Sequence, residues 1–227
     1  MSKYLIINVC IILIPLLFSF EGRLKFYKKF TSVIFAALPV ASIYIIWDSI
    51  ASARGDWSFN GNLISGHLLF RLPVEEILFF FTVSFSIIFI FETVKYFVKR
   101  KNIIIKNYYF TAGIILLIAL AVIFSGRIYT FTVLIFSAAS VSAVLLLFPA
   151  LLHSNIYWWT IGISYVPFFI VNYILTSLPV VIYNPEAIIG IRVKTIPVED
   201  LFYSFSMITF LLLFYHISET KRILKIK

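Results

Sequence analysis

Four acidic residues stand in two pairs whose residue types suit proton transfer. Both pairs directly follow a Pro-Val dipeptide, and they are Glu75-Glu76 and Glu199-Asp200. Apolar surroundings disfavour the ionised form of a carboxyl group, and a second carboxylate nearby disfavours it further. Each pair could therefore hold a protonated acid beside an ionised carboxylate, which are the two parts of general acid–base catalysis. The residue types do not distinguish the acid from the base.

A simpler interpretation of these motifs is structural. Proline is favoured at the start of a helix, and acidic residues in the first turn complement the helix dipole. This explains one motif, but it does not explain why four of the ten acidic residues form two matched pairs beside apolar segments. Ionisable groups at membrane depth are candidates for function. We therefore predict that Glu75, Glu76, Glu199 and Asp200 are catalytic.

The elements that position these acids must lie in lipid. Of the 227 residues, 62% are hydrophobic and 13% are charged, against about a quarter charged in a soluble domain. A helix needs about 20 apolar residues to cross a bilayer. The sequence predicts an all-α integral membrane protein with about seven transmembrane helices, near Tyr4–Phe20, Phe30–Ile50, Pro73–Val98, Tyr108–Ser125, Ile128–Leu152, Ile156–Ile182 and Pro197–His216. If the weak break at residues 125–127 is not a turn, there are six.

The basic residues predict the orientation of these spans. Thirteen Lys and Arg residues fall on one side of the predicted membrane and six on the other, and the richer side is expected to be cytoplasmic. The N-terminus is then outside and the C-terminus inside, which requires an odd number of spans. This arrangement accounts for the net charge of +9 without nucleic acid. We expect a multi-pass protein of the cell membrane.

The chain also contains an internal repeat at an offset of 124 residues. Seven of the 23 aligned positions from 59 to 81 are identical, and they include Asn60 with Asn184, Gly66 with Gly190 and Pro73 with Pro197. Further upstream, Asp48 aligns with Asn172. The repeat predicts two parallel three-helix units, residues 1–98 and 128–227, and a linker, residues 99–127, that contains the fourth span. Such units are related by a pseudo-two-fold axis along the membrane normal.

At these residues the sequence resembles the integral-membrane lycopene cyclases, in their fused single-chain form. That family carries a P-x-E-E motif followed by aromatic residues in each half, a W-D pair, and an aromatic-rich loop before the motif. The matching segments are Pro73–Glu76, Pro197–Asp200, Trp47-Asp48 and Trp57–Asn60. The chain departs from the pattern at Asp200, where glutamate is usual.

The resemblance implies the redox-neutral cyclisation of lycopene, through γ-carotene, to β-carotene. An acid protonates a terminal double bond, a neighbouring double bond attacks the cation, and a base removes a proton. Aromatic faces can stabilise a cation. No cofactor, metal or nucleic acid is expected, and the partners would be lycopene, the bilayer, and other carotenoid-pathway enzymes or a second copy of the chain. The predicted substrate-binding residues are Trp47, Asp48, Trp57, Asn60, Phe79, Asn172, Asn184 and Tyr203.

Two other function classes remain open. Seven-helix transporters with a 3+1+3 arrangement also contain parallel repeats, although polar residues near the centres of the spans are few here. A carotenoid-binding protein without catalysis would tolerate loss of the carboxylates, whereas a cyclase would not. A retinal-binding protein is excluded, because the seventh span contains no lysine for a Schiff base.

Overall fold

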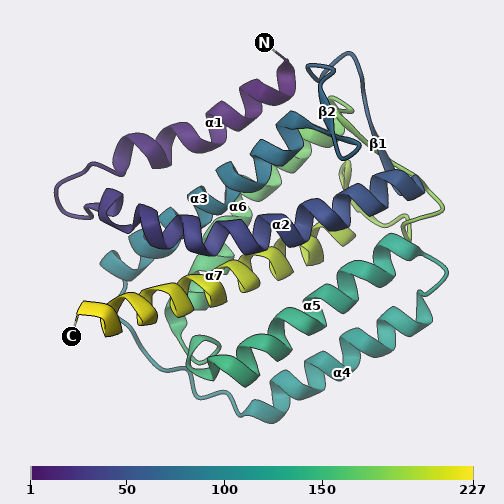
Figure 1. The fold of residues 1–227 in the computed structure, drawn as a ribbon. Coiled ribbons are helices and arrows are strands. Elements are labelled where there is room, and N and C mark those ends of the chain that lie inside the picture. The colour runs from purple at the N-terminus through teal and green to yellow at the C-terminus, as the bar shows by residue number, and fades with distance from the viewer. Residues whose placement is uncertain (1, 227) are drawn as a thin grey trace.

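The computed structural model describes residues 2–226, with side chains for residues 2–220. These residues form seven α-helices that run roughly alongside one another (Figure 1). Their bounds are α1 (Lys3–Phe18), α2 (Phe30–Arg54), α3 (Val74–Phe97), α4 (Asn107–Ile123), α5 (Ile128–Leu147), α6 (Asn155–Ser177) and α7 (Glu199–Ile226). Two short 3₁₀ helices, η1 (Phe26–Lys29) and η2 (Pro149–Leu151), precede α2 and follow α5.

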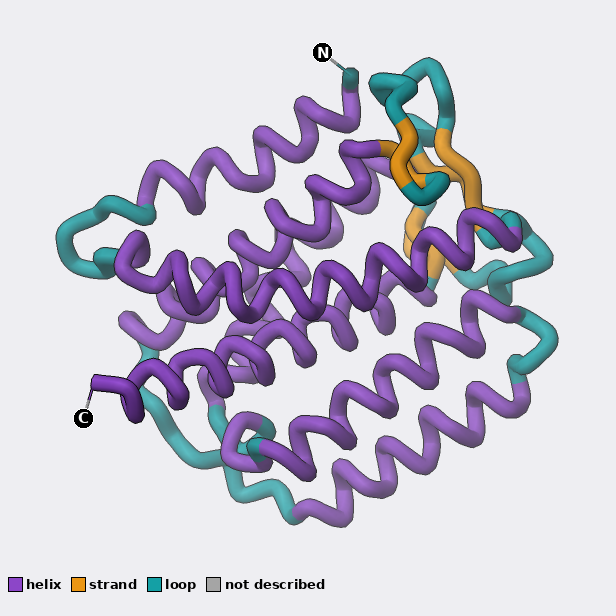
Figure 2. The backbone as a smooth tube through the Cα atoms, viewed as in Figure 1, coloured by secondary structure: helices purple, strands orange, loops and turns teal. Residues whose placement is uncertain are grey.

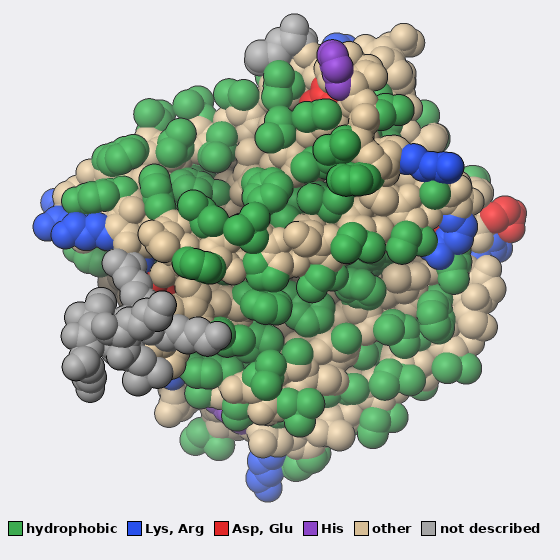
Figure 3. Space-filling model, in the orientation of Figure 1, with side chains coloured by type: hydrophobic (Ala, Val, Ile, Leu, Met, Phe, Trp, Pro, Cys, Tyr) green, Lys and Arg blue, Asp and Glu red, His purple; other side chains and the backbone are tan. Residues whose placement is uncertain are grey.

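The helices confirm an integral membrane protein. Among the described residues, α2, α3, α5, α6 and α7 are long and apolar enough to cross a bilayer, and α1 and α4 are apolar but shorter. Large apolar side chains cover much of the outer surface, while Lys and Arg gather toward the edges of the face in Figure 3. Phe97 is 75% exposed and Leu146 is 81% exposed. Lipid, rather than water, is the solvent that suits such a surface.

The helix bounds differ from the predicted spans where proline intervenes. Helix α5 ends at Leu147 rather than Leu152, because Pro149 cannot continue its hydrogen-bond ladder. Helix α6 ends at Ser177, before Pro179, and Val181–Tyr183 form a strand instead of further helix. A turn at residues 124–127 separates α4 from α5, so the described chain has seven helices rather than six. Lys221, Arg222, Lys225 and Lys227, which contributed to the predicted orientation, lie outside the described side chains.

The two repeats interlock. Helix α1 packs on α3, and its counterpart α5 packs on α7. Helix α2 of the first repeat packs against α7 of the second, while α6 of the second packs against α3 of the first. Helix α4 packs on α5 at the edge of the bundle (Figure 1). Each repeat therefore completes the other, and the main core, which includes Val40, Ile88, Val133 and Leu211, spans both.

Three two-stranded sheets gather at one end of the bundle, as Figure 2 shows. Strands β2 (Leu68–Leu69) and β3 (Leu72–Pro73) form a hairpin before α3, and β5 (Arg192–Val193) and β6 (Ile196–Pro197) form its counterpart before α7.

The third sheet joins the repeats. Strand β1 (Trp57–Phe59) pairs antiparallel with β4 (Val181–Tyr183), so that Trp57 lies opposite Tyr183 and Phe59 lies opposite Val181. Under the 124-residue offset Trp57 corresponds to Val181 and Phe59 to Tyr183, so the repeat turns each of these two pairs into the other. This register is the one expected if the pseudo-two-fold axis passes through the sheet.

Candidate functional site

Each acidic pair lies where a hairpin leads into a helix, and a glycine with a positive φ angle precedes each hairpin. Gly66 and Gly190 have φ values of +82° and +85°, a conformation that favours glycine. The residue before each glycine turns its amide toward the first acid of the pair. Ser65 N donates to Glu75 Oε1 at 2.6 Å, and Ile189 N donates to Glu199 Oε1 at 2.8 Å.

The first acid of each pair also binds a neighbouring helix. The Ser2 hydroxyl donates to Glu75 Oε1 at 2.6 Å, and the Thr130 hydroxyl donates to Glu199 Oε1 at 2.6 Å. Both glutamates are almost completely buried. Their described contacts join the hairpins to α1 and α5, and they are not among the residues that line the cavity described next. Glu75 and Glu199 thus lie beside the cavity rather than in its lining, and their catalytic role stays a prediction.

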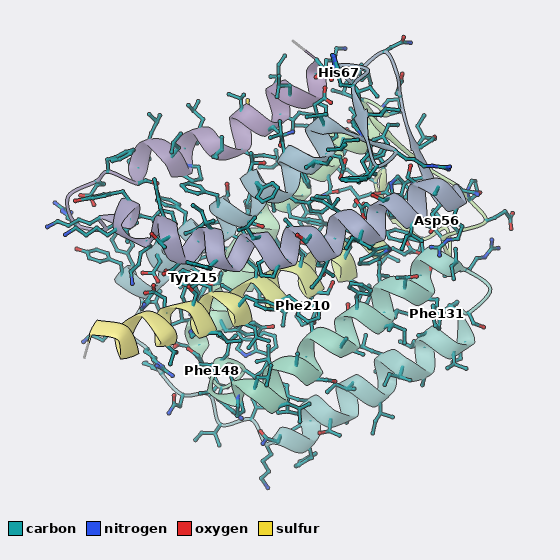
Figure 4. All side chains as sticks on the ribbon, in the orientation of Figure 1. Asp56, His67, Phe131, Phe148, Phe210 and Tyr215 are labelled. Carbon is teal, nitrogen blue, oxygen red and sulfur yellow. The ribbon has the colours of Figure 1, made fainter. Side chains whose placement is uncertain are left out.

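The second acids, Glu76 and Asp200, line one shared cavity of about 90 Å³, together with Asp48. The cavity lies at the hairpin end of the bundle, where Figure 4 shows His67 and Asp56; Tyr215 and Phe148 lie toward the other end. The exposed fractions of Asp48, Glu76 and Asp200 are 3%, 8% and 4%. The fold therefore brings together three carboxyl groups that are 28 and 124 residues apart in sequence.

Matched tyrosines hold the second acids. The Tyr4 hydroxyl donates to Glu76 Oε2 at 2.5 Å, and the Tyr129 hydroxyl donates to Asp200 Oδ1 at 2.8 Å. Tyr4 comes from α1 and Tyr129 from α5, so these two contacts are equivalent in the two repeats. Both tyrosines are buried.

The remaining contacts make the site asymmetric. Tyr183 donates to Asp200 Oδ2 at 2.8 Å, whereas its repeat counterpart, Phe59, has no hydroxyl to offer Glu76. Tyr203 donates to Asp48 Oδ1 at 2.9 Å, and its counterpart is Phe79. Asp200 thus receives two phenol donors and Glu76 one.

Tyr183 lies in β4, outside the membrane-spanning helices. Burial raises the pKa of the Tyr183 phenol well above its usual value, and the nearby Asp200 raises that pKa further. The phenol therefore stays protonated and remains a hydrogen-bond donor to Asp200 throughout the physiological pH range.

The predicted substrate-binding residues divide into two groups. Asp48, Trp57, Phe79, Asn172 and Tyr203 line the cavity. The other three residues, Trp47, Asn60 and Asn184, lie outside the cavity lining.

Each residue of the second group has another contact. Trp47 packs behind the cavity wall, with its ring centroid 4.8 Å from that of Tyr203. Asn60 and Asn184 accept hydrogen bonds from the amides of Asn62 and Glu186, at 3.1 and 3.0 Å, so they stabilise matched loop turns.

Sequence comparison of the repeats missed Tyr4, Tyr129 and Tyr183. Tyr4 and Tyr129 are 125 residues apart, one more than the offset that aligns the acidic motifs. A second alignment of the first helices, shifted by one residue, would have found this pair. Tyr183 was hidden because it aligns with Phe59, so only the structure shows its hydroxyl at Asp200.

This arrangement can donate a proton at one carboxyl group and accept one at another within a single small cavity. Trp57, Phe79 and Tyr203 supply aromatic faces beside these groups, and aromatic faces attract cations. The site is thus suited to a reaction that begins with protonation of an apolar substrate and passes through a cation.

Comparison with protein-family models matches the chain to the family described as lycopene cyclase, over residues 2–94 and 126–218. The two matched segments cover most of each three-helix repeat and leave out α4. Comparison with curated proteins and with solved structures gives no significant match.

Proposed function

Because the chain belongs to the lycopene cyclase family, we propose that it closes the linear ends of lycopene into β-rings, through γ-carotene to β-carotene. The observation that carries this proposal is the shared cavity of Asp48, Glu76 and Asp200, which has aromatic walls. Carboxyl groups provide the proton donor and acceptor that cyclisation needs.

The hydrogen bonds suggest which carboxyl group plays which role. Donors to a carboxylate favour its ionised form. Asp200 accepts from both Tyr129 and Tyr183, whereas Glu76 accepts from Tyr4. We therefore assign Glu76 as the acid and Asp200 as the base.

In the proposed reaction, Glu76 donates a proton to the terminal double bond of the substrate and leaves a tertiary carbocation. The electron pair of the internal double bond attacks this cation, closes the six-membered ring and forms a second tertiary cation. Asp200 then removes a ring proton, and the electrons of that C–H bond form the ring double bond. The substrate gains one proton and loses one, so it is isomerised.

The next turnover requires the proton to return from Asp200 to Glu76. Asp48 lines the same cavity as both groups and accepts a hydrogen bond from Tyr203 at 2.9 Å. It is therefore placed to relay the proton. Trp57 and Tyr203 present aromatic faces that would stabilise the passing cation.

Expression in a bacterial host that accumulates lycopene tests this function. The expected result is conversion of lycopene to γ-carotene and β-carotene by the wild-type chain and its loss in Glu76→Gln. Unchanged lycopene, with the protein present in the membrane, would overturn the proposal. Lycopene that copurifies with the protein without reacting would instead indicate a binding protein, and ε-rings in the product would overturn the β-ring assignment.

The expected setting is the cell membrane, with the hairpin end of the bundle outside and the C-terminus in the cytoplasm. Lycopene dissolves in the bilayer, so the substrate would reach the site from lipid. Other carotenoid-pathway enzymes, or a second copy of the chain, are the partners we propose.

A further inference from the structure

A groove of about 740 Å³ lies between α1 and α6 and crosses α3. It adjoins the carboxylate cavity, because the two spaces have five lining residues in common: Phe79, Val83, Phe168, Asn172 and Ser204. On α3 its lining extends from Phe79 to Ile90, a distance of roughly 16 Å at 1.5 Å per residue. The groove is therefore an elongated space that leads away from the acids.

The walls of the groove are apolar. Much of the lining is aliphatic and comes from Ile7, Ile11, Ile87, Val171 and Ile174. The Ser86 hydroxyl donates to the backbone oxygens of Thr82 and Ile11, at 2.8 and 3.1 Å, so this polar group is already satisfied. Lys3 and Asn172 also belong to the lining. Most of the wall offers a charged ligand no partner, and an extended hydrocarbon would not need any.

The repeat predicts a second groove between α5 and α2, but large side chains fill that position. Val171 aligns with Trp47 at the 124-residue offset, and Ile11 aligns with Phe136 at the 125-residue offset of Tyr4 and Tyr129. The ring centroids of Trp47 and Phe136 are 4.2 Å apart. Two aliphatic wall residues in one repeat are thus replaced in the other by two aromatic rings in contact.

We propose that the α1–α6 groove binds the polyene chain of the substrate while one linear end occupies the carboxylate cavity. This inference rests on the proposed function for the identity of the ligand. Its structural basis is independent, and consists of the shared lining residues of the two adjoining spaces, the largely apolar lining, and the filling of the equivalent position. The groove would then determine which substrates bind, by excluding chains with polar groups along their length.

Blocking the groove provides a test. Val171→Trp places in the groove the side chain that fills its counterpart at Trp47. The matched control is Val166→Trp on the same helix, because Val166 is 63% exposed and is not among the lining residues. We expect Val171→Trp to lower lycopene cyclisation by about tenfold or more, and Val166→Trp to keep the wild-type rate.

Cys10 supplies a measurement that does not depend on catalysis. It is the one cysteine of the chain, it is exposed, and it lines the groove. Lycopene bound to the Glu76→Gln variant in membranes should slow alkylation of Cys10 by a lipid-soluble maleimide several-fold. Adding Val171→Trp should remove this protection, and adding Val166→Trp should keep it.

The outcomes separate the groove from the reaction. A wild-type rate in Val171→Trp, or alkylation of Cys10 unaffected by lycopene, would overturn the proposal that the groove binds the polyene chain. Neither result would contradict the proposed cyclase activity. Protection of Cys10 in a chain that never cyclises lycopene would support the groove and overturn the proposed function.

Discussion

The two acids of each pair have different surroundings, although they are adjacent in sequence. The first acid accepts a hairpin amide and a hydroxyl from a neighbouring helix, and the second lines the cavity. We expect Glu76→Gln to lower cyclisation at least a hundredfold, because a general acid contributes about that much. Glu75→Gln should keep more activity, because its amide oxygen can still accept from Ser65 and Ser2. Pigment analysis, normalised to the amount of protein in the membranes, measures the activity of both variants. Equal losses of activity in the two variants would contradict this division of roles.

The hydrogen bond from the Tyr183 phenol to Asp200 gives a prediction about a single side chain. Tyr183→Phe gives this position the aromatic ring that Phe59 provides in the other repeat, and it removes the donor at 2.8 Å from Asp200. Losing this donor disfavours the ionised form of Asp200, so the carboxylate that accepts the proton would be present in a smaller fraction of molecules. We therefore expect a roughly tenfold slower rate, with thermal stability near that of the wild type. Tyr96→Phe is the control, since Tyr96 is 51% exposed. An unchanged rate in Tyr183→Phe would show that the Tyr183 hydrogen bond does not support Asp200 as the base.

At the scale of elements, the helices were predictable because a bilayer requires long apolar segments. Proline marks four of their ends, at the starts of α3 and α7 and just after α5 and α6. The position of both acidic pairs directly after a Pro-Val dipeptide also indicated that they lie at the starts of two equivalent helices. The packing of α2 on α7 and of α6 on α3 was not predictable, because the sequence shows which segments are alike and not which of them pack together. The division of the acids likewise depends on tertiary contacts, such as Thr130 with Glu199.

The hairpin glycines give a prediction about these elements. An alanine Cβ at Gly66 or Gly190 would meet no atom within 4 Å, but both residues have positive φ. Alanine should therefore cost about 1–2 kcal/mol of stability at each position through backbone strain alone. It should also displace the amide that donates to Glu75 or Glu199. Gly113→Ala in α4, which has equal space and no positive φ, should be neutral or stabilising. Thermal unfolding in detergent compares the three variants, and equal melting temperatures would refute the strain.

At the scale of the whole molecule, the pseudo-two-fold arrangement leaves the groove between α1 and α6 open beside the cavity, and aromatic rings fill the equivalent position between α5 and α2. A symmetric substrate with two linear ends can then place one end at the acids while the rest of its chain lies in the groove. The second end can react only after the product leaves and binds again in the opposite direction. Cyclisation of the two ends should therefore occur in separate binding events.

This separation is visible in the order of products. With lycopene in large excess over the protein, we expect monocyclic product to accumulate first, and bicyclic product to appear after a lag as the monocyclic form begins to compete for the groove. Chromatography of pigments sampled during the first turnovers measures both species. Bicyclic product that forms without a lag, at a constant ratio to the monocyclic form, would show that both ends react in one binding event. In that case the rings of Trp47 and Phe136 would have to move apart to open the second position.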